Sequence, residues 1–385
     1  MKITDVEAIV LESPCDSKDP EGCEEAAGVK RCLLIKVSTD EGITGWSDVE
    51  TAPHVGAAAV HAPGDMEMFA GLRALAVGED PFEVERLWDK IYRGTIYYGR
   101  RGVAIQALSG FDIACHDIIG KAIERPLCKV LGGAYRDRVR AYASTLFRST
   151  PDAMKRACET YLERGFTAIK FGWGIFGQDR KRDIALVKAA RKAVGPDIAL
   201  LIDPGWQVNR SAFDAIALLR DLEPFEIFWL EDFLHPECYE GYAKVKEAGF
   251  RTRLAAGEQE ATAWGFHDLI TRGKIDVAQP DLSRCGGLTQ VRKILWEVER
   301  AGIDLAPHAW LTDLLTAASL HVNACLPRSL FLEYNVSSNP MLREVIRNPI
   351  ALEKDGTMRV PHGPGLGIEI DEKAIAKFRI SGPLR

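Results

Sequence analysis

The sequence predicts an α/β protein built on a closed parallel barrel of the (β/α)8 TIM type, with an α+β capping domain. The main observation is a set of seven short apolar runs after Arg136, each followed by an amphipathic helical stretch. A doubly wound open sheet is the competing architecture, but the glycine-rich GxGxxG turn of that fold is absent. The runs are FTAIKFG, IALLIDPG, IFWLEDF, RLAAGEQE, IDVAQPD, IDLAPHAW and LFLEYN.

Each run carries a polar or charged residue at or just past its carboxyl end. Successive residues of this set are separated by 33, 28, 27, 23, 27 and 25 residues, which is what one strand, one helix and two loops require. In a parallel barrel these ends face one shared mouth, so the seven side chains should converge. The residues are Lys170, Asp203, Glu231, Glu258, Asp281, His308 and Glu333.

The first 125 residues have a different pattern. Residues 1–50 alternate like strands around a turn at residues 40–42, and residues 67–123 are helical in spacing. Strands followed by helices indicate an α+β domain. We therefore assign residues 1–125 to the capping domain and residues 126–350 to the barrel.

The last segment, residues 351–385, has the pattern of a hairpin followed by a return to the capping domain. We expect its loop to lie over the mouth of the barrel. This segment would complete the capping domain from the other end of the chain.

Composition narrows the class of protein. The chain of 385 residues is 46% hydrophobic and 27% charged, as in ordinary globular proteins, and its net charge of −6 gives no basic surface for nucleic acid. No apolar run approaches the roughly 18 residues of a membrane span, and the first residues lack the apolar stretch of a signal peptide, so we expect a cytoplasmic protein without membrane contact. The nine scattered cysteines, with no CxxC pair, predict reduced thiols.

Three consecutive predicted strands end in carboxylates, at Asp203, Glu231 and Glu258. Three anions in one mouth would repel one another unless a cation lies between them. Oxygen ligands with open positions for water and substrate suit one Mg²⁺ ion. A single carboxylate here could equally cap a helix or join a surface ion pair, but three in register favour a metal site.

The next two strand ends carry Asp281 and His308. Neighbouring strands lie about 4.8 Å apart, so the carboxylate can fix the imidazole tautomer and raise its basicity for proton transfer. The alternative is a structural core histidine. Lys170, across the mouth, is a candidate base, or a positive charge that binds a substrate carboxylate. Glu333 either forms a hydrogen bond with the substrate or holds a neighbouring side chain in place.

Such a site suits the removal of a proton next to a carboxylate. The reaction produces an enediolate, whose charge a divalent cation and nearby donors stabilise. Return of a proton to the other face gives epimerisation, whereas acid-assisted loss of a β-hydroxyl gives dehydration. The substrate would be a small carboxylate.

These motifs together resemble the enolase superfamily, and within it the mandelate racemase-like group of acid-sugar dehydratases and racemases. The resemblance extends over nearly the whole chain, through DEGITGW, SGFDIACHDIIGK, PLCKVLGG, the barrel motifs and GPGLGIEI. It implies a modified, (β/α)7β-like barrel, a homo-oligomer, three metal ligands at Asp203, Glu231 and Glu258, and a Lys or His base acting with Mg²⁺. It also implies an Asp281–His308 catalytic dyad, Glu333 bound to the substrate carboxylate, and Lys170 as the second lysine of a KxK motif.

The sequence departs from the family pattern where it has Ala168 in place of the first lysine of that motif. Without a neighbouring lysine, the pKa of Lys170 should be less depressed, which favours His308 as the principal base. L-rhamnonate dehydratase-like members of the family similarly rely on the His-Asp dyad. Asp-Phe follows Glu231 where the family usually has Glu-Pro, and Pro-Gly follows Asp203. These changes alter the walls of the site more than its ligands.

Substrate choice should depend on loops of the capping domain, near residues 13–28 and 50–61. Candidate substrate-binding or cavity-lining side chains are His54, Arg100, Arg101, Trp173 and Trp206. Dehydration of an aldonate or aldarate to a 2-keto-3-deoxy acid is the preferred hypothesis. A racemase, epimerase or cycloisomerase is the alternative within enzymes, and a sugar-acid-binding barrel without catalysis is the alternative outside them.

Overall fold

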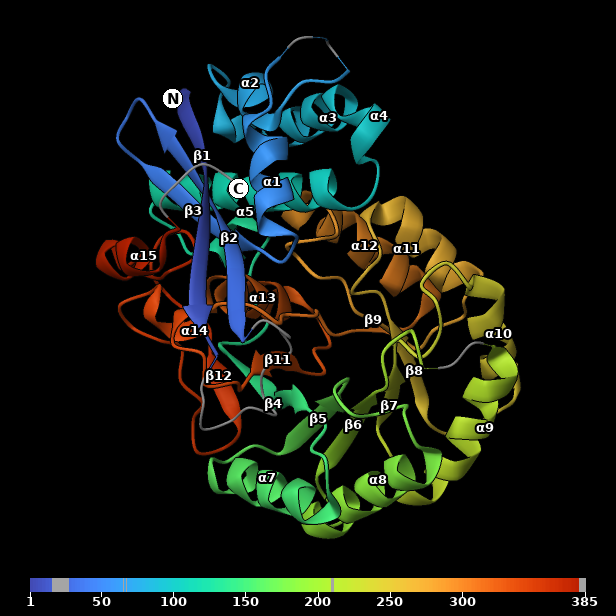
Figure 1. Cartoon of the computed structure of the whole chain (residues 1–385). Coiled ribbons are helices and arrows are strands. Elements are labelled where there is room, and N and C mark those ends of the chain that lie inside the picture. Colours follow the sequence, from blue (N-terminus) through green and yellow to red (C-terminus); the bar gives the residue numbers. More distant parts are fainter. Residues whose placement is uncertain (16–27, 65, 67, 209–210, 381–385) are drawn as a thin grey trace.

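The computed structural model describes residues 1–15, 28–64, 66, 68–208 and 211–380. It contains a barrel and a smaller capping domain that lies against one side of the barrel (Figure 1). This architecture confirms the predicted fold class. Among the described residues, none of the helices combines the length and the apolar composition that a membrane span requires.

In the described part of the chain, the barrel consists of eight parallel strands with seven helices between them, so its pattern is (β/α)7β. The strands run in sequence order around the sheet, and the last of them pairs in parallel with the first. The strands are β4 (Arg138–Leu146), β5 (Ala168–Gly172), β6 (Ala199–Asp203), β7 (Trp229–Glu231), β8 (Arg253–Ala256), β9 (Val277–Ala278), β10 (Asp304–Leu305) and β11 (Leu332–Asn335). The sequence prediction recognised seven of these strands and missed β4.

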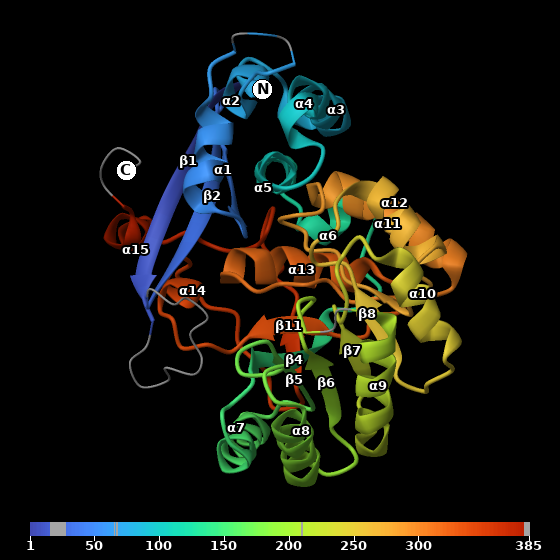
Figure 2. The ribbon, with the colours of Figure 1, turned by 45° about the vertical axis from the view of Figure 1, so that its right-hand side comes forward.

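The barrel helices lie on the outside of the strands, as Figure 2 shows for α7 to α9. Thr150, Asp179 and Ser211 each accept a backbone N–H at the start of the first three helices, which satisfies donors that have no partner within the helix. The helices are α7 (Pro151–Glu163), α8 (Arg180–Val194), α9 (Ala212–Leu222, followed by the 3₁₀ turn η3, Glu223–Phe225), α10 (Tyr239–Glu247), α11 (Thr262–Thr271), α12 (Gly287–Ala301) and α13 (Asp313–Cys325).

An apolar layer inside the barrel lies one pleat below the residues of the mouth. Successive side chains of a strand point to opposite faces, so a residue two positions before a mouth residue also points inward. Ala168 belongs to this layer, two positions before Lys170, which gives a packing reason for an apolar residue where the resemblance expects a lysine. The buried members are Tyr142, Ala168, Leu201, Trp229, Ala255, Val277, Ala306 and Phe331.

The capping domain begins with a three-stranded antiparallel sheet, β1 to β3. Helix α5 packs on this sheet and is buried along nearly its whole length, because it also faces the barrel. The elements are β1 (Ile3–Pro14), β2 (Val29–Thr39), β3 (Thr44–Val49), α1 (Pro53–His61), α2 (Leu72–Ala76), η2 (Pro81–Glu83), α3 (Val84–Gly94), α4 (Ile96–Gly99), α5 (Val103–Ala122) and α6 (Leu127–Val130).

Buried carboxylates of the capping domain fasten it to the barrel. Asp48 accepts hydrogen bonds from the backbone N–H and the hydroxyl of Thr312, at 2.9 and 2.6 Å. Asp112 accepts the same pair from Thr289, at 3.0 and 2.5 Å. Because a buried carboxylate without partners is costly, these contacts fix where the capping domain sits.

The carboxyl-terminal segment forms the predicted hairpin and returns to the capping domain. It follows α14 (Met341–Glu344) and contains β12 (Thr357–Arg359) and α15 (Glu372–Phe378). The backbone N–H of Ile380 donates to the carbonyl of Val10 in β1. The expectation that this loop covers the barrel mouth is wrong. Strand β12 pairs with the amino-terminal end of β4, at the opposite end of the barrel, and no described residue of 351–380 lines the mouth cavity.

The cysteine prediction is contradicted at one position, and three further expectations are not tested by the structure. Cys15 is disulfide-bonded, so the prediction of reduced thiols is wrong at this position, because scattered spacing cannot exclude a single pair. Among the described residues, the free cysteines are Cys32, Cys115, Cys128, Cys158, Cys238, Cys285 and Cys325. The domain boundaries, the homo-oligomeric state and the cytoplasmic location stay predictions.

His321 joins the barrel to the elements that flank it and should make stability depend on pH. Its Nδ1 accepts the backbone N–H of Cys128 in α6, and its Nε2 donates to the carbonyl of Leu366. Burial lowers the pKa of His321 from 6.5 to about 4. The unfolded chain therefore binds a proton more readily than the folded chain, and stability should fall as the pH falls from 6.5 to 4.

The matched variant is His321→Gln, which keeps one acceptor and one donor but does not titrate. Relative to this variant, the native chain should lose about 3 kcal/mol of unfolding free energy over that pH range, since each pH unit is worth about 1.4 kcal/mol. Urea titrations of both proteins at several pH values measure the difference. Parallel pH curves for the two proteins would show that His321 is not the group responsible.

Candidate active site

The seven residues predicted from the strand ends all lie at the carboxyl-terminal rim of the barrel. Lys170, Asp203, Glu231 and Glu333 lie within their strands, and Glu258, Asp281 and His308 follow theirs by two or three residues. A cavity of about 860 Å³ opens at this rim. Its lining includes five of the seven, namely Lys170, Asp203, Glu258, His308 and Glu333.

The three carboxylates of Asp203, Glu231 and Glu258 form one buried cluster, in which an oxygen of each lies within 4.8 Å of the others. Burial raises the pKa of Asp203 well above its ordinary value, and the charge of Glu231 raises it further. Burial also raises the pKa of Glu231. The raised pKa values show that the negative charge of the cluster is not fully balanced, and its all-oxygen donor set fits a hard divalent cation.

Neighbouring donors orient these carboxylates. The indole N–H of Trp173 donates to Asp203 Oδ2 at 3.1 Å, and the backbone N–H of Gly205 donates to Asp203 Oδ1 at 3.0 Å. The indole of Trp229, from the apolar layer below, donates to Glu231 Oε2 at 2.8 Å. Oriented ligands bind a metal more tightly because less freedom is lost on binding.

Lys170 is surrounded by carboxylates. Its Nζ lies 2.5 Å from Glu231 Oε1, 2.8 Å from Glu333 Oε1 and 3.9 Å from Asp203 Oδ2. Burial alone would lower the pKa of Lys170, but the charges of Glu231 and Glu333 outweigh it and hold the pKa well above its ordinary value. The ammonium group thus partly neutralises the cluster.

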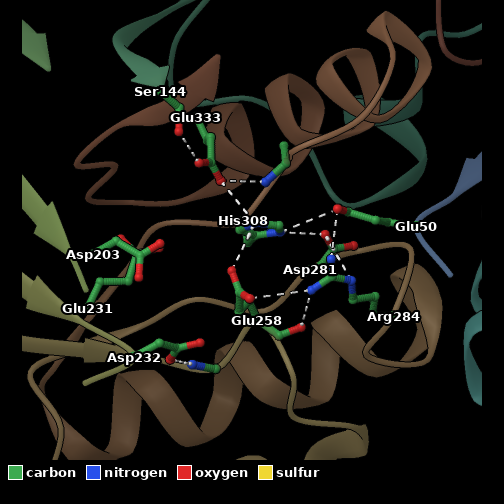
Figure 3. A network of polar contacts seen from close by, with 12 residues as sticks. Glu50, Ser144, Asp203, Glu231, Asp232, Glu258, Asp281, Arg284, His308 and Glu333 are labelled. Atoms are coloured by element: carbon green, nitrogen blue, oxygen red, sulfur yellow. Dashed lines mark hydrogen bonds and ion pairs between the residues drawn. The ribbon is translucent and has the colours of Figure 1, made fainter. Parts of the chain in front are cut away.

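His308 lies between the acidic cluster and Asp281 (Figure 3). Its Nδ1 lies 2.7 Å from Asp281 Oδ2, and its Nε2 lies 3.0 Å from Glu258 Oε2. Burial acts to lower the pKa of His308, but the charges of Glu258 and Glu333 raise it well above its ordinary value. The bond to Asp281 leaves Nε2 directed toward the cluster, where it can exchange a proton with a bound molecule.

Glu333 is held as a carboxylate. Its Oε1 accepts the hydroxyl of Ser144 and its Oε2 accepts the backbone N–H of Ala309, both at 2.7 Å. Burial acts to raise the pKa of Glu333, but Lys170 and His308 lower it to about 2. Of the two roles expected for Glu333, this geometry favours holding its neighbours in place.

Two charged residues of the cavity wall are Glu50, which begins the second predicted specificity loop but was not singled out there, and Arg284, which sequence reasoning missed. The guanidinium Nη2 of Arg284 lies 2.9 Å from Glu50 Oε1, and Glu50 Oε2 lies 3.9 Å from His308 Nδ1. Glu50 follows β3 in the capping domain, outside the barrel repeat that identified the other residues. Arg284 could have been found, because it lies in the same QPDLSRCGG motif as Asp281.

Only some of the side chains proposed to bind the substrate or line the cavity are found in the cavity wall. Trp173 and Trp206 line the cavity. His54, Arg100 and Arg101 do not, so the expectation that the two arginines line it is wrong. A role of His54 in substrate choice stays a prediction. Arg101 instead lies 3.6 Å from the carboxylates of Glu237 and Glu260, because the docking of the capping domain turns it toward the barrel surface. Residues 16–27 of the first predicted specificity loop lie outside the described residues.

Comparison with known proteins places this geometry in a family. The family described as "Enolase C-terminal domain-like" matches residues 153–374. The family described as "Mandelate racemase / muconate lactonizing enzyme, N-terminal domain" matches residues 7–132. The first match covers the barrel from helix α7 onward, and the second covers most of the amino-terminal part of the capping domain.

Individual relatives agree with these matches. A D-galactarolactone cycloisomerase from Agrobacterium fabrum is 33% identical, with 100% of each chain covered. A D-galactonate dehydratase from Xanthomonas euvesicatoria is 34% identical, with 92% of each chain covered. A racemase from Streptomyces coelicolor, solved with bound magnesium, is 25% identical and superposes with a TM-score of 0.84, covering 98% of this chain and 100% of the other. On the family matches and these full-length likenesses, this chain is an enzyme of the enolase superfamily, in its mandelate racemase-like group.

Proposed function

We propose that this enzyme removes the proton next to the carboxylate of an acid sugar and expels the β-hydroxyl as water, which gives a 2-keto-3-deoxy acid. The observation that carries the proposal is the position of His308 Nε2, which lies 3.0 Å from Glu258 Oε2 and faces the same cavity as the acidic cluster. A proton-transfer group and a cation site at this separation can act on one substrate molecule.

The proposed metal is one Mg²⁺ ion held by Asp203, Glu231 and Glu258. Three buried carboxylates whose oxygens lie within 4.8 Å of one another, with the pKa of Asp203 and of Glu231 raised, fit a divalent cation, and oxygen ligands with open positions fit Mg²⁺ in particular. When bound, the ion supplies positive charge where the enediolate develops. The buried ammonium of Lys170 supplies a second positive charge on the same side.

His308 acts twice in the proposed reaction. As a base, the neutral imidazole takes the α-proton on Nε2 while the C–H electron pair moves into the enediolate. A cation held by Glu258 would offset the carboxylate charge that raises the pKa of His308 and would so favour this neutral form. As an acid, the imidazolium then returns that proton to the departing β-hydroxyl, which leaves as water. The remaining enol becomes the keto acid, so the net change is loss of one water. Asp281 holds the imidazole through Nδ1 during both steps.

Lys170 contributes charge in this proposal and is not the base. Carboxylate oxygens at 2.5 and 2.8 Å hold its Nζ as an ammonium group, and Ala168 supplies no neighbouring cation to oppose this. Racemisation needs a base on each face of the substrate. The surroundings of Lys170 therefore support elimination with one base more than racemisation.

Cycloisomerisation is the second candidate. The full-length likeness to a D-galactarolactone cycloisomerase favours it. The first step would be the same, but the departing β-oxygen would remain attached as part of a ring that opens, so no water would be released. The two reactions thus share every residue assigned above and differ in the substrate.

The experiment is a screen of acid sugars and their lactones with the purified enzyme and Mg²⁺, run in ordinary water for the product masses and in deuterated water for exchange into recovered substrate. Dehydration predicts keto acids that react with semicarbazide and are lighter than the substrate by one water. Keto acids of unchanged mass would assign cycloisomerisation instead. Deuterium in recovered substrate without any keto acid would indicate a racemase, and no change in any compound would contradict the proposal.

A further inference from the structure

Asp281, the partner of His308, has both of its carboxylate oxygens occupied. Oδ2 accepts from His308 Nδ1 at 2.7 Å. Oδ1 accepts both the hydroxyl and the backbone N–H of Ser283, each at 2.7 Å. Asp281 and Ser283 are both 0% exposed, so water does not compete for these bonds. The two donors of Ser283 therefore determine which oxygen faces the imidazole.

Ser283 is in turn held by the capping domain. Its hydroxyl donates its single proton to Asp281, and the same oxygen accepts the backbone N–H of Glu50 at 3.1 Å. Glu50 follows β3, and 233 residues separate it from Ser283. A continuous chain of hydrogen bonds thus runs from the capping domain through Ser283 and Asp281 to His308.

The next residue of the motif strengthens this connection. Arg284 binds the carboxylate of Glu50 at 2.9 Å and donates to the backbone carbonyl of Glu258 at 3.2 Å. Two consecutive barrel residues therefore bind Glu50 of the capping domain. Ser283 binds the backbone N–H of Glu50, and Arg284 binds its carboxylate. Figure 3 shows Glu50 and Arg284 beside Asp281.

We propose that Ser283 is a positioning residue, which locks the Asp281 carboxylate between the capping domain and His308 and so fixes where the imidazole transfers a proton. This inference rests on the proposed proton-transfer role of His308. Without the hydroxyl, Asp281 Oδ1 keeps one donor of two, and the N–H of Glu50 loses its acceptor. The carboxylate can then rotate, and the imidazole follows it away from the reacting carbon.

Thr289 provides a matched control. Its hydroxyl and backbone N–H both bind one buried carboxylate, that of Asp112, just as those of Ser283 bind Asp281. Thr289 is also 0% exposed and also joins the barrel to the capping domain. It does not line the cavity. Thr289→Val therefore removes an equivalent hydroxyl that has no connection to His308.

The first test compares the kinetics of Ser283→Ala and Thr289→Val with the native enzyme. We expect both variants to lower Tm by similar amounts. Only Ser283→Ala should lower kcat, by about tenfold with KM unchanged, because misplacement of a catalytic group by a fraction of an ångström costs rate and not binding. Equal kcat values in the two variants, or a raised KM with native kcat in Ser283→Ala, would overturn the proposal.

The second test does not require turnover. The proton on His308 Nδ1, buried against a carboxylate, should give a resolved downfield NMR resonance, identified by its absence in His308→Asn. We expect Ser283→Ala to shift or broaden this resonance and Thr289→Val to leave it in place. An unmoved resonance in Ser283→Ala overturns the positioning role. A shifted resonance in an enzyme that turns over no acid sugar would instead contradict the proposed function alone.

Discussion

His308→Asn should lower kcat by about 10³-fold, which is within the range that removal of a general acid–base group produces. The asparagine amide can still donate to Asp281 Oδ2, so the dyad keeps its position. Nothing replaces Nε2, the atom that lies 3.0 Å from Glu258 and faces the cavity. Because the imidazole serves both as base and as acid in the proposed reaction, both steps should slow.

The measurement is steady-state kinetics together with exchange of the α-proton in deuterated water. Exchange of the α-proton should disappear along with turnover, because His308 Nε2 removes that proton in the first step of the proposed reaction. His267→Asn is the matched control, since His267 is a half-exposed histidine on helix α11 that binds Glu297 and does not line the cavity. Activity of His308→Asn within tenfold of the native value would remove His308 from proton transfer.

Asp203→Asn should abolish tight Mg²⁺ binding without destabilising the metal-free protein. In the absence of metal, the Asp203 carboxylate is buried beside other carboxylates, and its raised pKa shows that its charge is unfavourable there. The amide removes that charge and can still accept the N–H of Gly205. The same change removes one of three proposed ligands, so we expect Mg²⁺ affinity to fall at least about 100-fold, or about 2.7 kcal/mol.

Two measurements separate these effects. Calorimetric titration gives the affinity, and thermal unfolding with and without Mg²⁺ gives the stabilisation by bound metal, which should be present in the native enzyme and lost in the variant. Asp48→Asn is the control, because Asp48 is a buried carboxylate of the capping domain with a pKa of about 7 that lies outside the acidic cluster. Native Mg²⁺ affinity in Asp203→Asn would exclude Asp203 as a ligand.

The barrel and most of its rim could be predicted because both follow from local repetition. One strand, one helix and two loops set the spacing, and parallel strands bring their carboxyl ends to one rim whatever the loops do. Lys170, Asp203 and His308 were therefore found without knowledge of any contact. Strand β4 escaped because RVRAYASTL is not one of the runs that end in a charged residue.

The capping domain's contribution to the site could not be predicted in this way. Glu50 meets Ser283 and Arg284 across 233 residues of sequence, and that meeting depends on how two separately folded parts dock. The same docking turns Arg101 away from the cavity. No periodicity in the sequence encodes such a contact.

By itself, the sequence determined the barrel, its rim and the kind of chemistry that the rim residues support, because hydrophobic periodicity and strand direction are local properties. The tertiary structure alone decided that Ser283 joins the capping domain to Asp281, that Glu333 is held as a carboxylate, and that the carboxyl-terminal hairpin lies at the far end of the barrel. These outcomes depend on which buried polar groups find partners when the parts pack together, and only the packed molecule settles that.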